Sequence, residues 1–274
     1  MQFNILIKGG TVVDGTGAPA RKADVRISNG LITEVGPDLP VKGRERIVDA
    51  EGCYVSPGFI ETHNHYDAPL WWMPNLEPMS GYGITTSVNG NCGFSAAPMS
   101  DNEEANMEMI KIFSFFEDIP IKPFLEIPAW DWKKWSEYKD SMQRNLRMPV
   151  NMDFYCGHQA LRLAAMGLDA RERAATPQEI GVMADLLRDA LAAGALGFSS
   201  NTMDYDGQGR PVPSLLADDA EFSALFDVLD EFPGKTFQIL LSVFMRMTGV
   251  SDMQRLEPLL EGRKFKVMWA GVPT

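Results

Sequence analysis

After Pro57 the sequence alternates between short apolar runs and helical patterns, and this alternation restricts the fold more than any other feature. One helical pattern has clear limits: Thr176 and Glu179 form a capping box, Pro177 takes the first helical position, and Gly194 follows the apolar stripe. Strand-like runs separated by helices are typical of βα units around a parallel sheet. We predict strands at residues 58–62, 85–89, 152–156, 195–199, 236–241 and 265–269, and further helices at residues 218–229 and 252–260.

Residues 1–56 show a different pattern, with only short strands and turns. Apolar and polar residues alternate in several runs, and Asn29-Gly30 separates two of them. An Asn-Gly pair in this position is the strongest short-range signal for a β-hairpin. We therefore predict a small β domain over residues 1–56 and an α/β domain over residues 57–274.

Residues 101–149 interrupt the alternation of the second domain. The segment is rich in aromatic residues, including Trp130, Trp132 and Trp135, and we predict a partly helical insertion after the second strand. It can pack over the strand ends, or it can form a lid or pocket wall for an apolar substrate group. We favour packing, because aromatic clusters most often belong to a core.

Charge and cysteine content argue against several functions. The net charge of -12 disfavours nucleic acids and anionic membranes as partners. Three irregularly spaced cysteines do not form a disulfide framework. The N-terminus has the pattern of a strand and not of a signal peptide, and no apolar run is long enough to span a membrane. These features predict a cytoplasmic protein.

His63 and His65 follow the first predicted strand of the second domain. Side chains two residues apart on an extended chain point to the same side, so the two imidazoles can face one point. Neutral imidazole is the commonest metal ligand in proteins, and the pair is therefore a candidate metal site. The pattern is short, and two hydrogen-bonded histidines on a polar loop would give the same pattern.

Cys92 favours the metal site. It lies in a glycine-flanked loop directly after the second predicted strand. Loops that follow neighbouring parallel strands line the same face, so we expect Cys92 beside the two histidines. A thiolate with two imidazoles suits Zn²⁺. We predict His63, His65 and Cys92 as zinc ligands, and we interpret Cys53 and Cys156 as structural cysteines.

His158 follows the third predicted strand and is expected to face the same region. We consider two roles: it binds and orients the substrate, or it caps the helix that follows. Asp67 is the carboxylate nearest to the histidine pair in the sequence, but we do not assign it as a catalytic base.

Three stretches together resemble the N-acyl-D-amino-acid deacylases, which are D-aminoacylases of the metal-dependent amidohydrolase superfamily. They are residues 57–67, 83–94 and 194–200, and the Gly-Asn-Cys-Gly-Phe-Ser loop around Cys92 is the specific part. The resemblance runs from the N-terminus to about Pro213. It implies a small β-sandwich-like domain, a (β/α)₈ TIM-like barrel, zinc, and hydrolysis of the amide of a small-molecule N-acyl-D-amino acid. It also implies that Cys92 takes the ligand place that a carboxylated lysine fills in other superfamily members, and that a barrel aspartate acts as general base.

The later strands depart from the family pattern. The family supplies further metal-ligating histidines from strands five and six and a catalytic aspartate from strand eight, whereas this chain has three histidines and none follows His158. About six βα units make only part of an eight-unit barrel. We therefore expect a partial barrel that forms a homo-oligomer, binds a completing subunit or continues beyond residue 274. No catalytic residue is assigned.

Three functions fit these observations. The leading prediction is a metal-dependent hydrolase of N-acyl-D-amino acids. The second is a non-catalytic, metal-binding relative that associates with a complete subunit. The third is an amidohydrolase acting on cyclic amides, which the loop around Cys92 disfavours.

Overall fold

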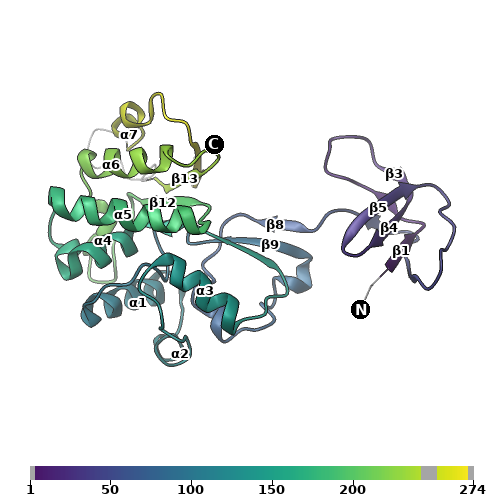
Figure 1. The fold of residues 1–274 in the computed structure, drawn as a ribbon, viewed down its shortest axis with the longest axis horizontal. Helices are drawn as coiled ribbons and strands as arrows, with labels where there is room; N and C mark the ends of the chain where they lie inside the picture. Colours follow the sequence, from purple (N-terminus) through teal and green to yellow (C-terminus); the bar gives the residue numbers. More distant parts are fainter. Residues whose placement is uncertain (1–3, 242–251, 271–274) are drawn as a thin grey trace. The chain divides into compact units, whose positions relative to one another are not determined.

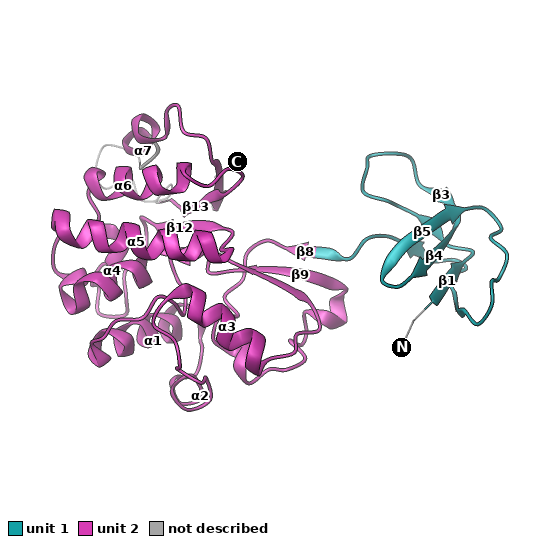
Figure 2. Ribbon diagram, viewed as in Figure 1, with its two compact units in different colours: residues 1–59 teal, residues 60–274 magenta. Residues whose placement is uncertain are grey.

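The chain divides at Phe59 in a computed structural model that describes residues 4–241 and 252–270. Residues 1–59 form one compact unit and residues 60–274 form the other (Figure 2). None of the helices in the described ranges combines the length and the apolar character needed to cross a membrane.

The first unit consists of two small sheets, with strand orders β5-β4-β1-β6 and β3-β2-β7. Val12 and Val25, one from each sheet, share its small core. The predicted hairpin is confirmed: β4 and β5 pair antiparallel, and Asn29 and Gly30 between them have φ of 52° and 78°. The strands are β1 (Asn4–Lys8), β2 (Thr11–Val12), β3 (Arg21–Lys22), β4 (Asp24–Ser28), β5 (Leu31–Gly36), β6 (Arg46–Asp49) and β7 (Tyr54–Val55).

The second unit is built on parallel strands that lie where the alternation of patterns predicts them. β10 and β11 are two halves of one segment interrupted at Tyr155, so β10 pairs with β9 while β11 pairs with β12. The order is then β12-β13-β14, and at the other side β9 pairs with β8. Within the described ranges these strands do not close into a barrel. They are β8 (Phe59–Glu61), β9 (Ile84–Asn89), β10 (Asn151–Phe154), β11 (Cys156–Gly157), β12 (Gly197–Asn201), β13 (Thr236–Leu240) and β14 (Lys266–Ala270).

Helices connect these strands, and α4, α5 and α6 lie side by side in chain order (Figure 1). The predicted capping box of α5 is present: Thr176 Oγ1 accepts a hydrogen bond from Glu179 N, and the Glu179 carboxylate accepts one from Thr176 N. Gly194 ends this helix with a left-handed φ of 111°. The helices are α1 (Glu103–Glu117), α2 (Ile121–Glu126), α3 (Trp135–Asn145), α4 (His158–Met166), α5 (Pro177–Ala193), α6 (Asp219–Asp230) and α7 (Asp252–Leu260).

Residues 101–149 contain α1, α2 and α3, and they both pack in an apolar cluster and line a cavity. Phe113 and Phe124 are buried in an apolar cluster, as the packing interpretation expects. The end of α1 has a second role, because Phe116, Glu117 and Ile119 line a cavity at the strand ends. Packing and pocket wall were treated as alternatives, but one segment supplies both.

Candidate metal site

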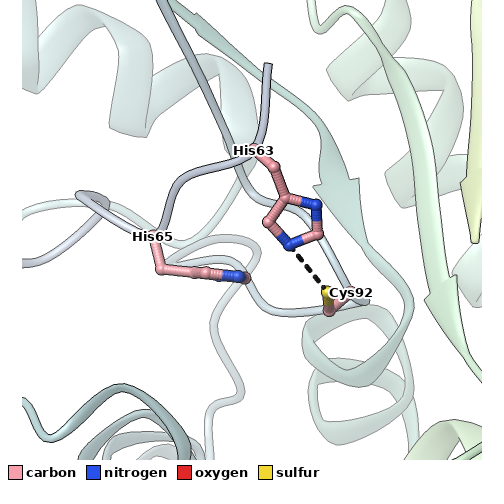
Figure 3. Close-up of side chains that lie close together, drawn as sticks. All are labelled: His63, His65 and Cys92. Atoms are coloured by element: carbon pink, nitrogen blue, oxygen red, sulfur yellow. Dashed lines mark hydrogen bonds between the residues drawn. The ribbon is translucent and has the colours of Figure 1, made fainter. Parts of the chain in front are cut away.

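The three residues predicted as metal ligands come together beyond the ends of β8 and β9 (Figure 3). One donor atom of each residue lies within 4.8 Å of the donor atoms of the other two. The closest contact joins Cys92 Sγ and His63 Nε2 at 3.2 Å. His63 is exposed, His65 is half-buried and Cys92 is buried, so the group opens toward solvent from a buried sulfur.

Hydrogen bonds from three elements hold Cys92 and its loop. The Gln238 side chain on β13 accepts from Cys92 N at 2.7 Å, and the Gln159 side chain on α4 donates to Cys92 O at 3.2 Å. Ser199 on β12 donates its hydroxyl to Gly90 O at the start of the loop. Cys92 itself has a left-handed φ of 54°, which costs a non-glycine residue on the order of 1 kcal/mol or more. The surrounding hydrogen bonds hold this strained residue and thereby fix the direction of its thiol.

Gly90 and Asp67 support the same loop. Gly90 has φ of 70°, and a Cβ atom there would lie 2.6 Å from Tyr155 O, so a larger residue is excluded. Its N–H donates to Asp67 Oδ2 at 3.1 Å. Asp67 is fully buried, and burial raises the pKa of its carboxyl to about 7. Asp67 does not line the cavity. Its contact with Gly90 N shows that it holds the loop in position.

Burial sets the protonation states of the three candidate ligands. Partial desolvation of its ring lowers the pKa of His63 although the residue is exposed, and burial lowers the pKa of His65 to about 3, with a further contribution from His63. Burial also raises the pKa of the Cys92 thiol, and Asp204 and Glu117 add to that rise. The histidines are therefore in their ligating form, whereas Cys92 must release a proton when an ion binds. His65 Nδ1 is buried and has no hydrogen-bond partner.

His63, His65 and Cys92 line a cavity of about 570 Å³, which has an apolar wall and an acidic wall. The apolar wall includes Phe94, Phe116 and Leu240. Glu117 and Asp204 supply the acidic wall, and the described lining residues include no lysine or arginine. Burial raises the pKa of Asp204, and burial together with the charge of Asp204 raises the pKa of Glu117 to about 7.

Sequence reasoning missed both carboxylates. One signal was available for Glu117: it is the last residue of α1, where the helix dipole disfavours negative charge, and Asp118 follows it. A residue that is unfavourable for local structure is often found at a functional site. Asp204 lies in an irregular loop after β12, and no comparable signal marks it.

His158 lies elsewhere. It is fully buried at the first position of α4 and makes no capping hydrogen bond to that helix. Its Nδ1 is 2.8 Å from Ser200 Oγ and its Nε2 is 2.7 Å from Glu221 Oε1, while Arg162 pairs with the same Glu221. The structure therefore places His158 in a buried polar cluster and not at the predicted substrate site.

The described parts of the later strands bring no further histidine to the cavity. Gln238 of β13 instead reaches the site through its hydrogen bond with Cys92 N. The histidines that the family pattern places on strands five and six are thus absent from β13 and β14.

Residues 46–264 match the model of the amidohydrolase family. The chain belongs to this family. This amidohydrolase is 34% identical over 199 residues to the D-aminoacylase of Alcaligenes xylosoxydans xylosoxydans, and 37% identical over 203 residues to the N-acyl-D-glutamate deacylase of the same organism. The alignments cover 72% and 73% of this chain and 37% of each relative, so this chain matches only part of the length of these relatives. The predicted resemblance to the N-acyl-D-amino-acid deacylases is confirmed.

Two solved structures resemble this amidohydrolase. One is the N-acyl-D-glutamate deacylase of Bordetella bronchiseptica, in complex with zinc and a phosphonate inhibitor that mimics the tetrahedral intermediate. It matches with a TM-score of 0.75 and 30% identity over 97% of this chain and 51% of that chain. The other is a D-aminoacylase with a binuclear metal centre, with a TM-score of 0.71 and 27% identity over 99% of this chain and 59% of that chain. The described βα units therefore correspond to part of an amidohydrolase fold.

Proposed function

We propose that this amidohydrolase hydrolyses the amide bond of N-acyl-D-amino acids in a metal-dependent reaction. The observation that carries the proposal is the convergence of His63, His65 and Cys92 on one cavity, in a chain similar to D-aminoacylase. Two imidazole nitrogens and one thiolate sulfur suit Zn²⁺, and three protein ligands are typical of catalytic zinc sites.

Each part of the cavity has a task in this reaction. Zn²⁺ at these ligands would supply a water of lowered pKa and polarise the acyl carbonyl. Phe94, Phe116 and Leu240 offer an apolar surface for the acyl group and exclude water from it. Gln238 and Gln159 keep the Cys92 backbone in place, so the thiolate is positioned before substrate arrives.

Zinc content and hydrolysis test the proposal together. The zinc-loaded chain should hydrolyse N-acetyl-D-amino acids in preference to the L enantiomers. Cys92→Ala should lose both zinc and turnover, whereas Cys53→Ala, which changes an exposed cysteine, should keep both. Hydrolysis of a cyclic amide without hydrolysis of any N-acyl-D-amino acid would contradict the proposal and show that the substrate is a cyclic amide.

A non-catalytic, metal-binding subunit is the second candidate. It is favoured by the absence of histidines from β13 and β14. Such a chain would form homo-oligomers or bind a completing subunit. Stoichiometric zinc that Cys92→Ala removes, without turnover in either form, would select this function.

A further inference from the structure

The apolar wall of the cavity contains two stacked phenylalanine rings. Phe94 comes from the loop that carries Cys92, and Phe116 comes from the last turn of α1. The centroids of these two rings lie 5.4 Å apart, with the ring planes at 28°. The Phe94 ring also lies 5.4 Å from the His65 ring. The apolar wall therefore extends from a candidate metal ligand to α1.

Packing of α1 fixes the position of Phe116. Three residues earlier on the same helix, Phe113 is fully buried, and its ring centroid lies 5.9 Å from that of Phe94 and 5.5 Å from that of Phe124. Residues three apart lie on one face of a helix, so these contacts hold Phe116 toward the cavity. Phe115 lies on another face: it is 53% exposed and lines a separate cavity of about 220 Å³. The apolar wall is therefore positioned before a substrate binds.

The cavity offers more room than an acetyl group needs. Its volume of about 570 Å³ is in the range of pockets that bury drug-sized ligands, which are far larger than an N-acetyl amino acid. Met73, Ile119 and Leu240 line it together with the two rings and enlarge its apolar surface. A substrate group that covers this surface removes it from water, and each buried methylene strengthens binding by up to about fourfold.

The acyl end of the substrate fits this wall better than the amino-acid end. An N-acyl amino acid has an uncharged acyl chain on one side of the amide and an α-carboxylate on the other. Glu117 and Asp204 line the same cavity and repel that carboxylate when they are ionised, and the described lining residues include no lysine or arginine to bind it. We propose that this amidohydrolase prefers N-acyl-D-amino acids whose apolar acyl group is longer than acetyl, and that Phe116 determines the preference. The proposal rests on the proposed function and names its substrate class.

A series of acyl lengths tests the preference. With the zinc-loaded chain, kcat/KM should rise from N-acetyl- to N-butanoyl- to N-hexanoyl-D-alanine. The hexanoyl substrate should exceed the acetyl substrate by at least about tenfold, because four more methylenes can cover the wall. Phe116→Ala removes one ring from the wall and should lose most of this ratio, whereas kcat/KM for the acetyl substrate should change by less than about threefold.

Phe115→Ala is the matched control. It removes the same ring from the adjacent residue of α1, outside the metal-site cavity, and the ratio of the two kcat/KM values should stay within about twofold of wild type. Phe116→Trp keeps an aromatic residue and narrows the cavity, so it should lower kcat/KM for the hexanoyl substrate more than for the acetyl substrate. Each ratio is measured on one protein sample, so a smaller fraction of folded chain does not change it.

Hydroxamate binding provides a measurement that needs no turnover. Acetohydroxamate and hexanohydroxamate present the same metal-binding group and differ only in the length of the apolar chain. Calorimetric titration of the zinc-loaded chain should show that hexanohydroxamate binds at least about tenfold more tightly. Phe116→Ala should reduce this difference, and Phe115→Ala should keep it.

The outcomes separate the acyl preference from the proposed function. Equal kcat/KM for all three substrates, or an equal loss for all three in Phe116→Ala, would overturn the preference and leave the hydrolase. A loss in Phe116→Ala that is confined to N-acetyl-D-phenylalanine would show that the wall binds the amino-acid side chain, which also contradicts the proposal. No hydrolysis, together with a hydroxamate preference that Phe116→Ala reduces, would support the apolar site and reject the hydrolase. No hydrolysis and no hydroxamate preference would reject both.

Discussion

The three histidines of this chain lie in two different surroundings. His63 and His65 follow β8, and His158 follows β11, so all three come after parallel strands. His63 and His65 line a cavity, and His65 Nδ1 has no partner. His158 is fully buried, and both of its ring nitrogens have hydrogen-bond partners.

The difference lies in what the protein itself provides for each ring. An imidazole whose two nitrogens are bonded inside the fold has no lone pair left for an ion or a substrate. The imidazoles of His63 and His65 line a cavity, so an ion or a substrate can reach them. Position after a strand therefore does not distinguish a binding histidine from a structural one, but the partners of its two nitrogens do. The two clusters should therefore respond separately to substitution.

Removal of the buried Glu221 carboxylate should have the largest effect on the free energy of unfolding. Glu221→Gln leaves the fully buried Arg162 without its carboxylate partner, and we expect a loss of about 3–5 kcal/mol in the free energy of unfolding. Denaturant unfolding measures this loss. Glu231→Gln, which breaks a surface pair with Arg188, should cost less than about 1 kcal/mol.

The same variant tests the independence of the cavity. Zn²⁺ affinity of folded Glu221→Gln, measured at a temperature well below its unfolding transition, should match that of wild type. A folded variant with strongly reduced affinity would show that the buried cluster controls the metal site.

Removal of a cavity histidine should weaken Zn²⁺ binding and have a smaller effect on stability. His65→Asn should weaken Zn²⁺ binding by more than roughly a hundredfold, because changes to the outer-shell partners of a ligand already cost about 10- to 100-fold. The free energy of unfolding of the metal-free chain should fall by less than in Glu221→Gln, because His65→Asn leaves no buried charge without a partner. Competition with a chelator and denaturant unfolding in the presence of a chelator measure the two quantities. A large loss of metal-free stability would assign His65 to the structural class.

Local patterns were sufficient to predict the parts of the fold and site that depend on neighbouring residues. The period change at Pro57 predicts strands near β8 to β14, and the capping box predicts the start of α5. His63, His65 and Cys92 were predictable together because strand ends of neighbouring parallel strands meet at one edge.

Residues that depend on distant packing could not be predicted in this way. Glu117 reaches the cavity only because α1 packs beside the strand ends, and Asp204 does so from an irregular loop. His158 was predicted to face the site, but α4 begins at this residue and its ring meets Glu221, which lies 63 residues later in the chain. The glutamine that holds Cys92 N comes from 146 residues away.

The smallest expected effect is on the pH dependence of folding stability. Burial lowers the pKa of His158 below the 6.5 of an exposed histidine. Burial alone would raise the pKa of Glu221, but its hydrogen bonds with His158 and Arg162 lower it below 4.5. As pH falls below 6.5, the unfolded chain binds a proton at this histidine and the folded chain does not. Folding stability therefore decreases with falling pH, by at most about 1.4 kcal/mol per pH unit for this group.

The variant His158→Gln removes this titration and keeps an amide that can hydrogen-bond. Its free energy of unfolding without metal should be lower than that of wild type near neutral pH, and it should fall less steeply toward about pH 5. Part of the decrease should remain, because burial also lowers the pKa of His63 and His65. Denaturant unfolding at a series of pH values, with a chelator present, gives both slopes. Equal slopes for His158→Gln and wild type would mean that His158 binds its proton as readily in the folded chain as in the unfolded chain.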